Sequence, residues 1–368
     1  MYPLLHAMNL AYNTHLPAAQ RQTLAAKGPQ AELPAPCDAV RIWHSLARDW
    51  LEEAPRRFWR TVHSPDYPPG LLQLKNPPLI LFGEGEAALL GARSIGVVGS
   101  RSATRTGLAN AQAFASAMAT QGWAIVSGLA EGIDGAAHHG ALEAHGATVA
   151  VLGCGPDVVF PAHHSGLVRR IVGQGGLVLS EYPPGTAPQK AFFPRRNRII
   201  AALSDGLLVV EAALRSGSLI TARYASELGR AVGAVPGSIH NTHSKGCHAM
   251  IKQGALLVET AQDLLNEVQA SLPTHRKACP PLLQEGHNLG LQHLAPGGDP
   301  AEEPGCELSD DLAHVLGQVG HHPEHIDRLA GLAGIACDQA FVALTELELM
   351  GLVVAEPGNR WVLSGQPC

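Results

Sequence analysis

The sequence has few aromatic residues, no disulfide pattern and no long apolar run. Phe, Trp and Tyr account for only 5% of the 368 residues, so Ala and Gly must fill much of the interior. The seven cysteines are odd in number and include no C-x-x-C pair, which favours free thiols in a reducing cytosol over a disulfide framework. No apolar run approaches the ~18 residues of a membrane span, so no membrane association is expected.

The sequence also lacks a strong excess of either charge. A formal net charge of −6 gives no polyelectrolyte signal, so a nucleic-acid site would have to be a local patch. Residues 1–6 show neither the charged nor the long apolar segment of a signal peptide, and together with the free thiols this predicts a cytoplasmic protein. The length predicts two or three domains, and the apolar content of 46% is enough for a real core.

Short apolar runs alternate with helix-length amphipathic segments between residues 95 and 259. Each run has the composition of a buried strand, and each ends in a polar, Gly-rich loop. The alternation predicts an α/β fold in which a parallel sheet is covered by helices on both faces. Ligands of such sheets bind at the carboxyl ends of the strands, where these loops fall. After an opening run that ends before Gly99, the expected strands are 123–127, 148–152, 176–180, 206–210 and 231–235.

The segments before and after the sheet domain (residues 66–270) differ from it in composition. Residues 1–65 show helical spacing at 17–26 and 39–53, which predicts a short helical N-terminal region with little core of its own. Residues 271–307 are rich in Pro and Gly and lack periodicity, which is typical of a linker.

Residues 308–368 regain periodicity and predict a small winged-helix domain, with three helices followed by a β hairpin. The last helix contains three acids and no Lys or Arg. Reading a DNA groove requires cations and polar side chains, so a protein contact or a packing role is favoured for this helix. The expected elements are helices 310–317, 326–332 and 338–350 and strands 352–355 and 360–363.

Gly99, Ser100 and Arg101 follow the opening strand and lead into a helix. Backbone N–H groups at a helix start favour a phosphate, and the Arg101 guanidinium would add a charge-assisted donor. The alternative is a tight turn with a solvated arginine. The sequence contains neither the G-x-G-x-x-G fingerprint nor a P-loop, which argues against those nucleotide-binding classes. A second anion site of this kind is predicted at Ser216, Gly217 and Ser218.

The most informative segment is residues 190–198, which hold four cations, no acid and two adjacent aromatics in nine positions. Cations that neutralise phosphates, beside an aromatic face that stacks on a base, form the usual site for single-stranded nucleic acid. The alternative is a solvated basic helix end whose phenylalanines belong to the core.

Other clusters of reactive side chains give weaker signals. His240, His243, Cys247 and His248 have ligand-like chemistry, but their spacing fits no zinc pattern, so no metal site is expected. Asp134 is expected to cap a helix or to lie in its first turn. No Ser/His/Asp order and no pair of carboxylates stands out, so no catalytic residue is predicted.

Taken together, the loops resemble the DNA-processing protein A family (DprA, also called Smf). The similarity is strongest over residues 66–259 and extends to the winged-helix pattern at 308–363. It rests on ordered motifs at 95–101 (IGVVGSR), 127–134 (SGLAEGID), 150–153 (AVLG), 193–201 (FPRRNRIIA), 210–222 (VEAALRSGSLITA), 234–237 (AVPG) and 251–255 (IKQGA).

The resemblance implies an extended Rossmann domain that binds single-stranded DNA without sequence preference and is not an enzyme. It implies a homodimer, without a cofactor, that protects incoming strands and helps to load RecA during natural transformation. Single-strand DNA-binding protein is a further candidate partner. The family's DNA pocket corresponds in this sequence to Arg101, Lys190, Phe193, Arg195, Arg196, Asn197 and Arg198.

An enzyme of the nucleotide phosphoribohydrolase class is the alternative, because that class also has a Rossmann-like sheet. Its P-G-G-x-G-T-x-x-E loop would correspond to residues 215–221, which lack the double glycine and the glutamate at that spacing; Glu227 comes later. Catalysis would need an acid beside a ribosyl carbon, and the sequence supplies no clear one. The binding protein is therefore the preferred interpretation.

Overall fold

The computed structural model describes residues 4–28, 31–271, 314–319, 324–349, 353–356 and 360–363. The chain divides into two units, residues 1–284 and 285–368. The predicted linker lies outside the described residues, except for its position 271. No helix in the described part of the chain is long and apolar enough to span a bilayer.

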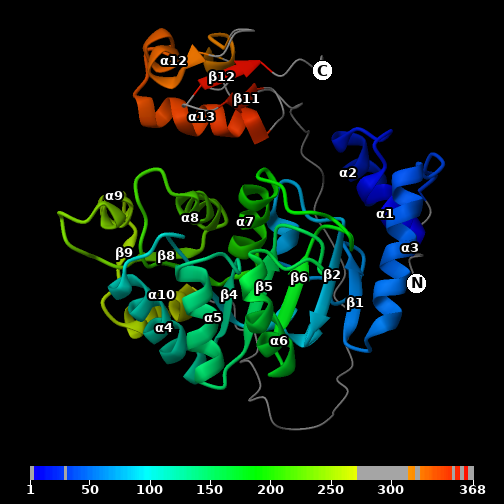
Figure 1. The fold of residues 1–368 in the computed structure, drawn as a ribbon, viewed down its shortest axis with the longest axis horizontal. Helices are drawn as coiled ribbons and strands as arrows, with labels where there is room; N and C mark the ends of the chain where they lie inside the picture. The colour runs from blue at the N-terminus through cyan, green and yellow to red at the C-terminus, as the bar shows by residue number, and fades with distance from the viewer. Residues whose placement is uncertain are drawn as a thin grey trace. The chain divides into compact units, whose positions relative to one another are not determined.

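The first unit is built on a nine-stranded sheet with the order β1-β2-β6-β5-β4-β3-β7-β8-β9 (Figure 1). The strands from β3 onward pair in parallel, which confirms the predicted parallel sheet, whereas β2 is antiparallel to β6 and β1 is antiparallel to β2. Every expected strand is present within one residue at each end. The bounds are β1 Arg57–Thr61, β2 Ile80–Gly85, β3 Ser94–Val98, β4 Ala124–Ser127, β5 Thr148–Leu152, β6 Leu177–Ser180, β7 Gly206–Val209, β8 Ala231–Ala234 and β9 Leu256–Leu257.

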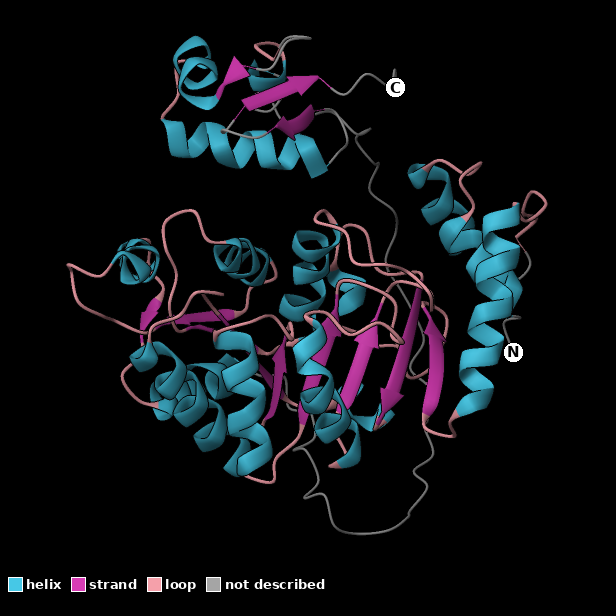
Figure 2. Ribbon diagram, in the orientation of Figure 1, coloured by secondary structure: helices cyan, strands magenta, loops and turns pink. Residues whose placement is uncertain are grey.

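Helices cover both faces of this sheet, as predicted (Figure 2). Successive strand residues point to opposite faces, so Val149 and Val151 of β5 join one core while Ala150 and Leu152 join another. One face is covered by α4 (Arg105–Thr120), α5 (Ile133–Glu143), α6 (Ser165–Gly173) and α10 (Ala261–Ser271). The other is covered by α7 (Phe192–Leu203), α8 (Gly217–Glu227) and α9 (Lys245–Lys252).

The N-terminal region adds three helices: α1 (Leu4–Tyr12), α2 (Ala18–Ala26) and α3 (Asp38–Glu53). The helices expected at 17–26 and 39–53 are therefore present, whereas α1 and strand β1 were not predicted. Met8 and Trp50 pack with Phe82 of β2 in one buried cluster, and the Trp50 and Phe82 rings meet edge to face at 6.3 Å. The N-terminal region thus builds its core jointly with the edge of the sheet.

The second unit is the expected winged-helix domain. Its sheet has the order β10-β12-β11, and Leu329, Leu344 and Trp361 lie in its buried core. Residues 310–313 of the helix expected at 310–317 and the turn of the hairpin lie outside the described residues, and residues 314–316 are helical. The bounds are β10 Glu324–His325, α12 Ile326–Ala333, α13 Cys337–Leu349, β11 Val353–Glu356 and β12 Arg360–Leu363.

Candidate nucleic-acid interface

The predicted site residues lie at the carboxyl ends of the parallel strands. The loop Gly99–Arg101 follows β3, and the segment 181–191 connects β6 to α7. A third loop, 210–216, connects β7 to α8. Because these strands run in parallel, their loops emerge at one edge of the sheet, where such folds bind ligands.

The buried Glu211 holds the loop after β3 in place. The Glu211 carbonyl accepts a hydrogen bond from the Ser100 N–H at 2.7 Å, and its carboxylate accepts from the Thr104 N–H at 2.9 Å and the Thr104 hydroxyl at 2.5 Å. Thr104 caps α4 by accepting from the Gly107 N–H at 3.0 Å. The start of this helix therefore already faces a carboxylate of the protein itself, where the sequence suggested a phosphate. Arg101 remains exposed.

Gly132 allows a second loop to cross directly beneath Ser100 and Arg101. Its φ is +76°, and a Cβ there would lie 2.3 Å from the Ser100 carbonyl oxygen and 2.6 Å from that of Arg101. The next residue, Ile133, donates its N–H to the Ser100 carbonyl at 3.2 Å. These contacts fix the backbone from which the Arg101 side chain projects.

Arg101 lies against Phe193, as one cation–aromatic pair of the predicted pocket. The guanidinium carbon is 5.4 Å from the centroid of the Phe193 ring, which is half-buried at the start of α7. The ring rests against Gly153, where a Cβ would approach it to 2.9 Å. On another side the ring meets Phe160 at a centroid distance of 5.4 Å. The structure thus brings together residues from two separate loops and from the start of α7.

Lys190, Arg195 and Asn197 belong to the same segment of the chain as Phe193. Lys190 is exposed in the turn before α7. The Arg195 side chain is 58% exposed, with its Nε 3.8 Å from Glu181 Oε1. Asn197 donates its side-chain N–H to the Gly217 carbonyl at 3.4 Å, which connects α7 to the start of α8.

Arg196 and Arg198 point into the protein. Arg196 is 2% exposed, and its Nη1 donates to the carbonyls of Gly128 (2.6 Å) and Val151. Burial lowers the pKa of Arg196 to about 10, against the opposing effect of the Asp134 carboxylate. Arg198 is also buried, and its Nη2 is 2.5 Å from Glu181 Oε2. The sequence placed both cations in the DNA pocket, whereas the structure gives both an internal partner.

Asp134 lies in the first turn of α5, one of the two places predicted for it. It is buried and accepts a hydrogen bond from the Gly128 N–H at 3.1 Å. Burial raises the pKa of Asp134, and the nearby Arg196 guanidinium opposes that rise. Together with Gly128, the Asp134 and Arg196 side chains form a buried polar group.

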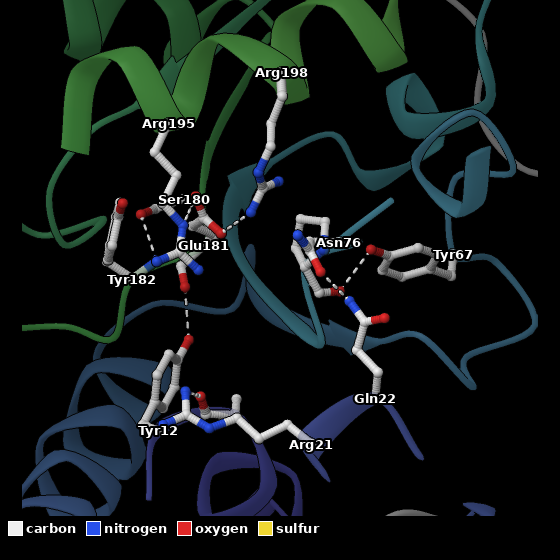
Figure 3. A network of polar contacts seen from close by, with 12 residues as sticks. Tyr12, Arg21, Gln22, Tyr67, Asn76, Ser180, Glu181, Tyr182, Arg195 and Arg198 are labelled. Atoms are coloured by element: carbon white, nitrogen blue, oxygen red, sulfur yellow. Dashed lines mark hydrogen bonds and ion pairs between the residues drawn. The ribbon is translucent and has the colours of Figure 1, made fainter. Parts of the chain in front are cut away.

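Glu181 connects the site to the N-terminal helices (Figure 3). Its carboxylate faces Arg195 and Arg198, and its carbonyl accepts the Tyr12 hydroxyl of α1 at 2.6 Å. The ring of Tyr182 stacks on Phe192 at 4.2 Å, so of the two adjacent aromatics Phe192 packs inward and Phe193 lies beside Arg101.

The second predicted anion site is capped by its own side chains. Ser216 is the N-cap of α8 and accepts a hydrogen bond from the Ser218 N–H at 3.4 Å, while Ser218 itself is buried. Gly217 is exposed. His243 of the histidine cluster lies 3.2 Å from the Ser100 hydroxyl, and the described residues include no group of three or more side chains able to hold a metal ion.

The parallel sheet, with cations and an aromatic ring at the carboxyl ends of its strands, places this protein in the class of Rossmann-like proteins. The chain matches the family model described as DNA recombination-mediator protein A over residues 59–269 and the DprA winged helix domain over residues 299–359. The chain therefore belongs to the DNA recombination-mediator protein A family.

Named relatives agree with this assignment. The chain is 40% identical to Protein Smf of Escherichia coli K12 over 312 residues, which is 84% of this chain and 78% of the relative. It is 46% identical to DNA processing protein DprA of Streptococcus pneumoniae R6 over 203 residues, 55% of this chain and 71% of the relative.

Two solved structures share the fold. DNA processing protein A from Streptococcus pneumoniae superposes with a TM-score of 0.61 at 37% identity, covering 72% of this chain and 97% of that one. The Helicobacter pylori protein, described for its single-stranded DNA binding mode, gives 0.52 at 29% identity, covering 58% and 96%.

Proposed function

We propose that this protein binds single-stranded DNA along a rim formed by Arg101, Lys190, Phe193 and Arg195. The observation that carries the proposal is the Arg101 guanidinium carbon 5.4 Å from the centroid of the half-buried Phe193 ring. A cation that neutralises a phosphate beside a ring that stacks on a base suits a single strand, whose bases are unpaired. The Helicobacter pylori relative, described for its single-stranded DNA binding mode, supports this choice.

The proposal extends to the role of the bound strand. We infer that the protein acts in the cytoplasm as a homodimer that protects incoming single strands and helps to load RecA during natural transformation. Single-strand DNA-binding protein is a further candidate partner in that step. Membership in a family of recombination mediators supports this role.

The acids of the site support binding over catalysis. Glu211 and Asp134 are buried and hydrogen-bonded to backbone N–H groups, and Glu181 is buried beside Arg198. Glu227, the acid that the phosphoribohydrolase alternative would need, forms an exposed pair with Arg223 at 2.8 Å. Each of these carboxylates already has a partner within the protein. We therefore propose a binding protein that is not an enzyme.

The test is fluorescence anisotropy of labelled oligo-dT and of the matching duplex across a salt series. Wild type should prefer the single strand, and Arg101→Ala should lose about 10-fold or more in affinity, because hydrogen bonds to charged groups contribute about 1.5–3 kcal/mol. Lys190→Ala should weaken binding less. Lys252→Ala, which removes an exposed cation at the end of α9, is the matched control. Equal binding of single and double strands, or none at low salt, would refute the proposal.

A further inference from the structure

Phe160 is an exposed aromatic side chain beside the proposed DNA rim. It is 45% exposed, and it is the aromatic member of the exposed large apolar residues in the described part of the chain. An apolar ring in water gains free energy when a partner covers it. This exposure is not predictable from the sequence, because Val158, Val159, Phe160 and Pro161 have the composition of a core segment.

The loop that carries Phe160 is fixed at several points. It follows β5, and Gly155 donates its N–H to the Thr186 carbonyl at 2.9 Å. Asp157 accepts the Gly185 N–H at 2.9 Å, and Val158 packs on the core beneath. The loop is thus held against the segment that leads into α7, and Phe160 projects from a defined support.

The rings of Phe160 and Phe193 are in contact with each other. Their ring centroids are 5.4 Å apart and the ring planes are inclined by 43°, so no base fits between them. Arg101 lies over Phe193 from the loop after β3. Two rings side by side, with a cation over one of them, offer two adjacent stacking surfaces.

We propose that Phe160 stacks on the base next to the one that stacks on Phe193, so that the site takes two neighbouring bases of a single strand. This inference rests on the proposed function. Base–aromatic stacking tolerates any base, which suits a protein that binds without sequence preference. The bound strand would then pass from the Arg101–Phe193 pair over the loop after β5.

The experiment compares oligo-dT with an abasic oligomer of the same length, which keeps the phosphates and lacks the bases. Phe160→Ala should weaken binding of oligo-dT by about 5- to 100-fold and leave binding of the abasic oligomer unchanged. Phe160→Tyr keeps a ring and should bind like wild type. Ile42→Ala, which removes an exposed apolar side chain from α3, is the control and should have no effect.

The outcomes separate this inference from the proposed function. If Phe193→Ala weakens binding of oligo-dT and Phe160→Ala does not, the second stacking position is refuted and the DNA rim stands. Equal weakening for both oligomers would mean that Phe160 only shapes its loop, which also refutes the inference. If wild type binds no single strand, the proposed function fails first.

Discussion

Lys190 and Arg195 lie on the surface of the basic segment 190–198, whereas Arg196 and Arg198 of the same segment lie inside the protein. Consecutive residues of a helix project about 100° apart, so Arg195 and Arg196 must point to different surroundings. The outer cations remain available to phosphates. The inner cations bind carbonyls and a carboxylate beneath the rim. A run of cations in a sequence therefore measures the total charge of a segment and not the charge that a ligand meets.

The largest effect on stability should come from replacing Arg198, one of the buried cations of the segment 190–198. Arg198→Met leaves the buried Glu181 carboxylate without its main partner, and should lower the free energy of unfolding by about 3–5 kcal/mol in urea titrations. Adding Glu181→Gln should recover a large part of that loss. Arg195→Ala, on the exposed half, should change stability by less than about 0.5 kcal/mol. Equal stability of the Arg198→Met and Arg195→Ala variants would remove the distinction between the two halves.

A second test acts on the backbone under Arg101. Gly132→Ala places a Cβ against the carbonyls of Ser100 and Arg101 at a positive φ, and should cost about 2–4 kcal/mol of unfolding free energy. It should also weaken DNA binding, because the loop that carries Arg101 must shift. Gly166→Ala in α6 has open space around its Cβ and should be neutral or slightly stabilising in the same urea titrations. A stable Gly132→Ala variant with full DNA binding would contradict this view of the loop.

The free energy of unfolding should also depend on pH, through His138, which is buried near Arg196. Burial first, and then the nearby His164, His139 and Arg196, lower the pKa of His138 from 6.5 to about 3. The unfolded chain takes up this proton near pH 6.5 and the folded protein does not, so the stabilisation is full above pH 6.5 and is lost as pH falls towards 3. The loss should reach about 1.4 kcal/mol per pH unit.

Urea titrations between pH 7 and 4 measure this slope. His138→Gln should remove that part of the slope, whereas His15→Gln, at an exposed position, should leave it unchanged. The same slope in wild type and in His138→Gln would show that His138 is protonated in the folded protein.

The smallest effect concerns the exposed cations Lys190 and Arg195 and the salt dependence of DNA binding. If Lys190 and Arg195 each neutralise one phosphate, each alanine substitution should reduce the slope of log affinity against log salt by about 0.7 for a single strand. Lys252→Ala should leave the slope unchanged. An unchanged slope for Lys190→Ala would remove that residue from the DNA contact.

The sequence predicts the sheet well and the site only in part. Strands such as β5 are apolar on both faces and end in Gly-rich loops, a pattern that few other structures produce. Strand β1 was missed because Arg57 and Arg60 interrupt a short run at the edge of the sheet. Helix α1 was also missed, and its buried residues Ala7 and Met8 belong to the same core cluster as Phe82 of β2.

The division of the basic segment could not be predicted, since it depends on distant partners. Arg196 bonds to carbonyls 45 and 68 residues away in the chain, and Arg198 meets Glu181 only because β6 and α7 return to the same place. The same is true of Glu211, whose carboxylate accepts the Thr104 N–H at the start of α4, where the sequence predicted a phosphate. Phe160 shows the reverse case, a residue that resembles core and is exposed.

The two edges of the nine-stranded sheet give the protein protection against uncontrolled self-association. An open edge strand offers unpaired backbone groups to any other chain, and charged side chains or a covering helix prevent such strand addition. At one edge Arg57 of β1 pairs with Glu84 at 3.0 Å and donates to the Trp50 carbonyl of α3 at 2.8 Å, which ties a helix to that strand. At the other, β9 is only two residues long. Copies of this chain brought close together, as the proposed binding to one DNA strand would do, are thus kept from pairing through the edges of their sheets.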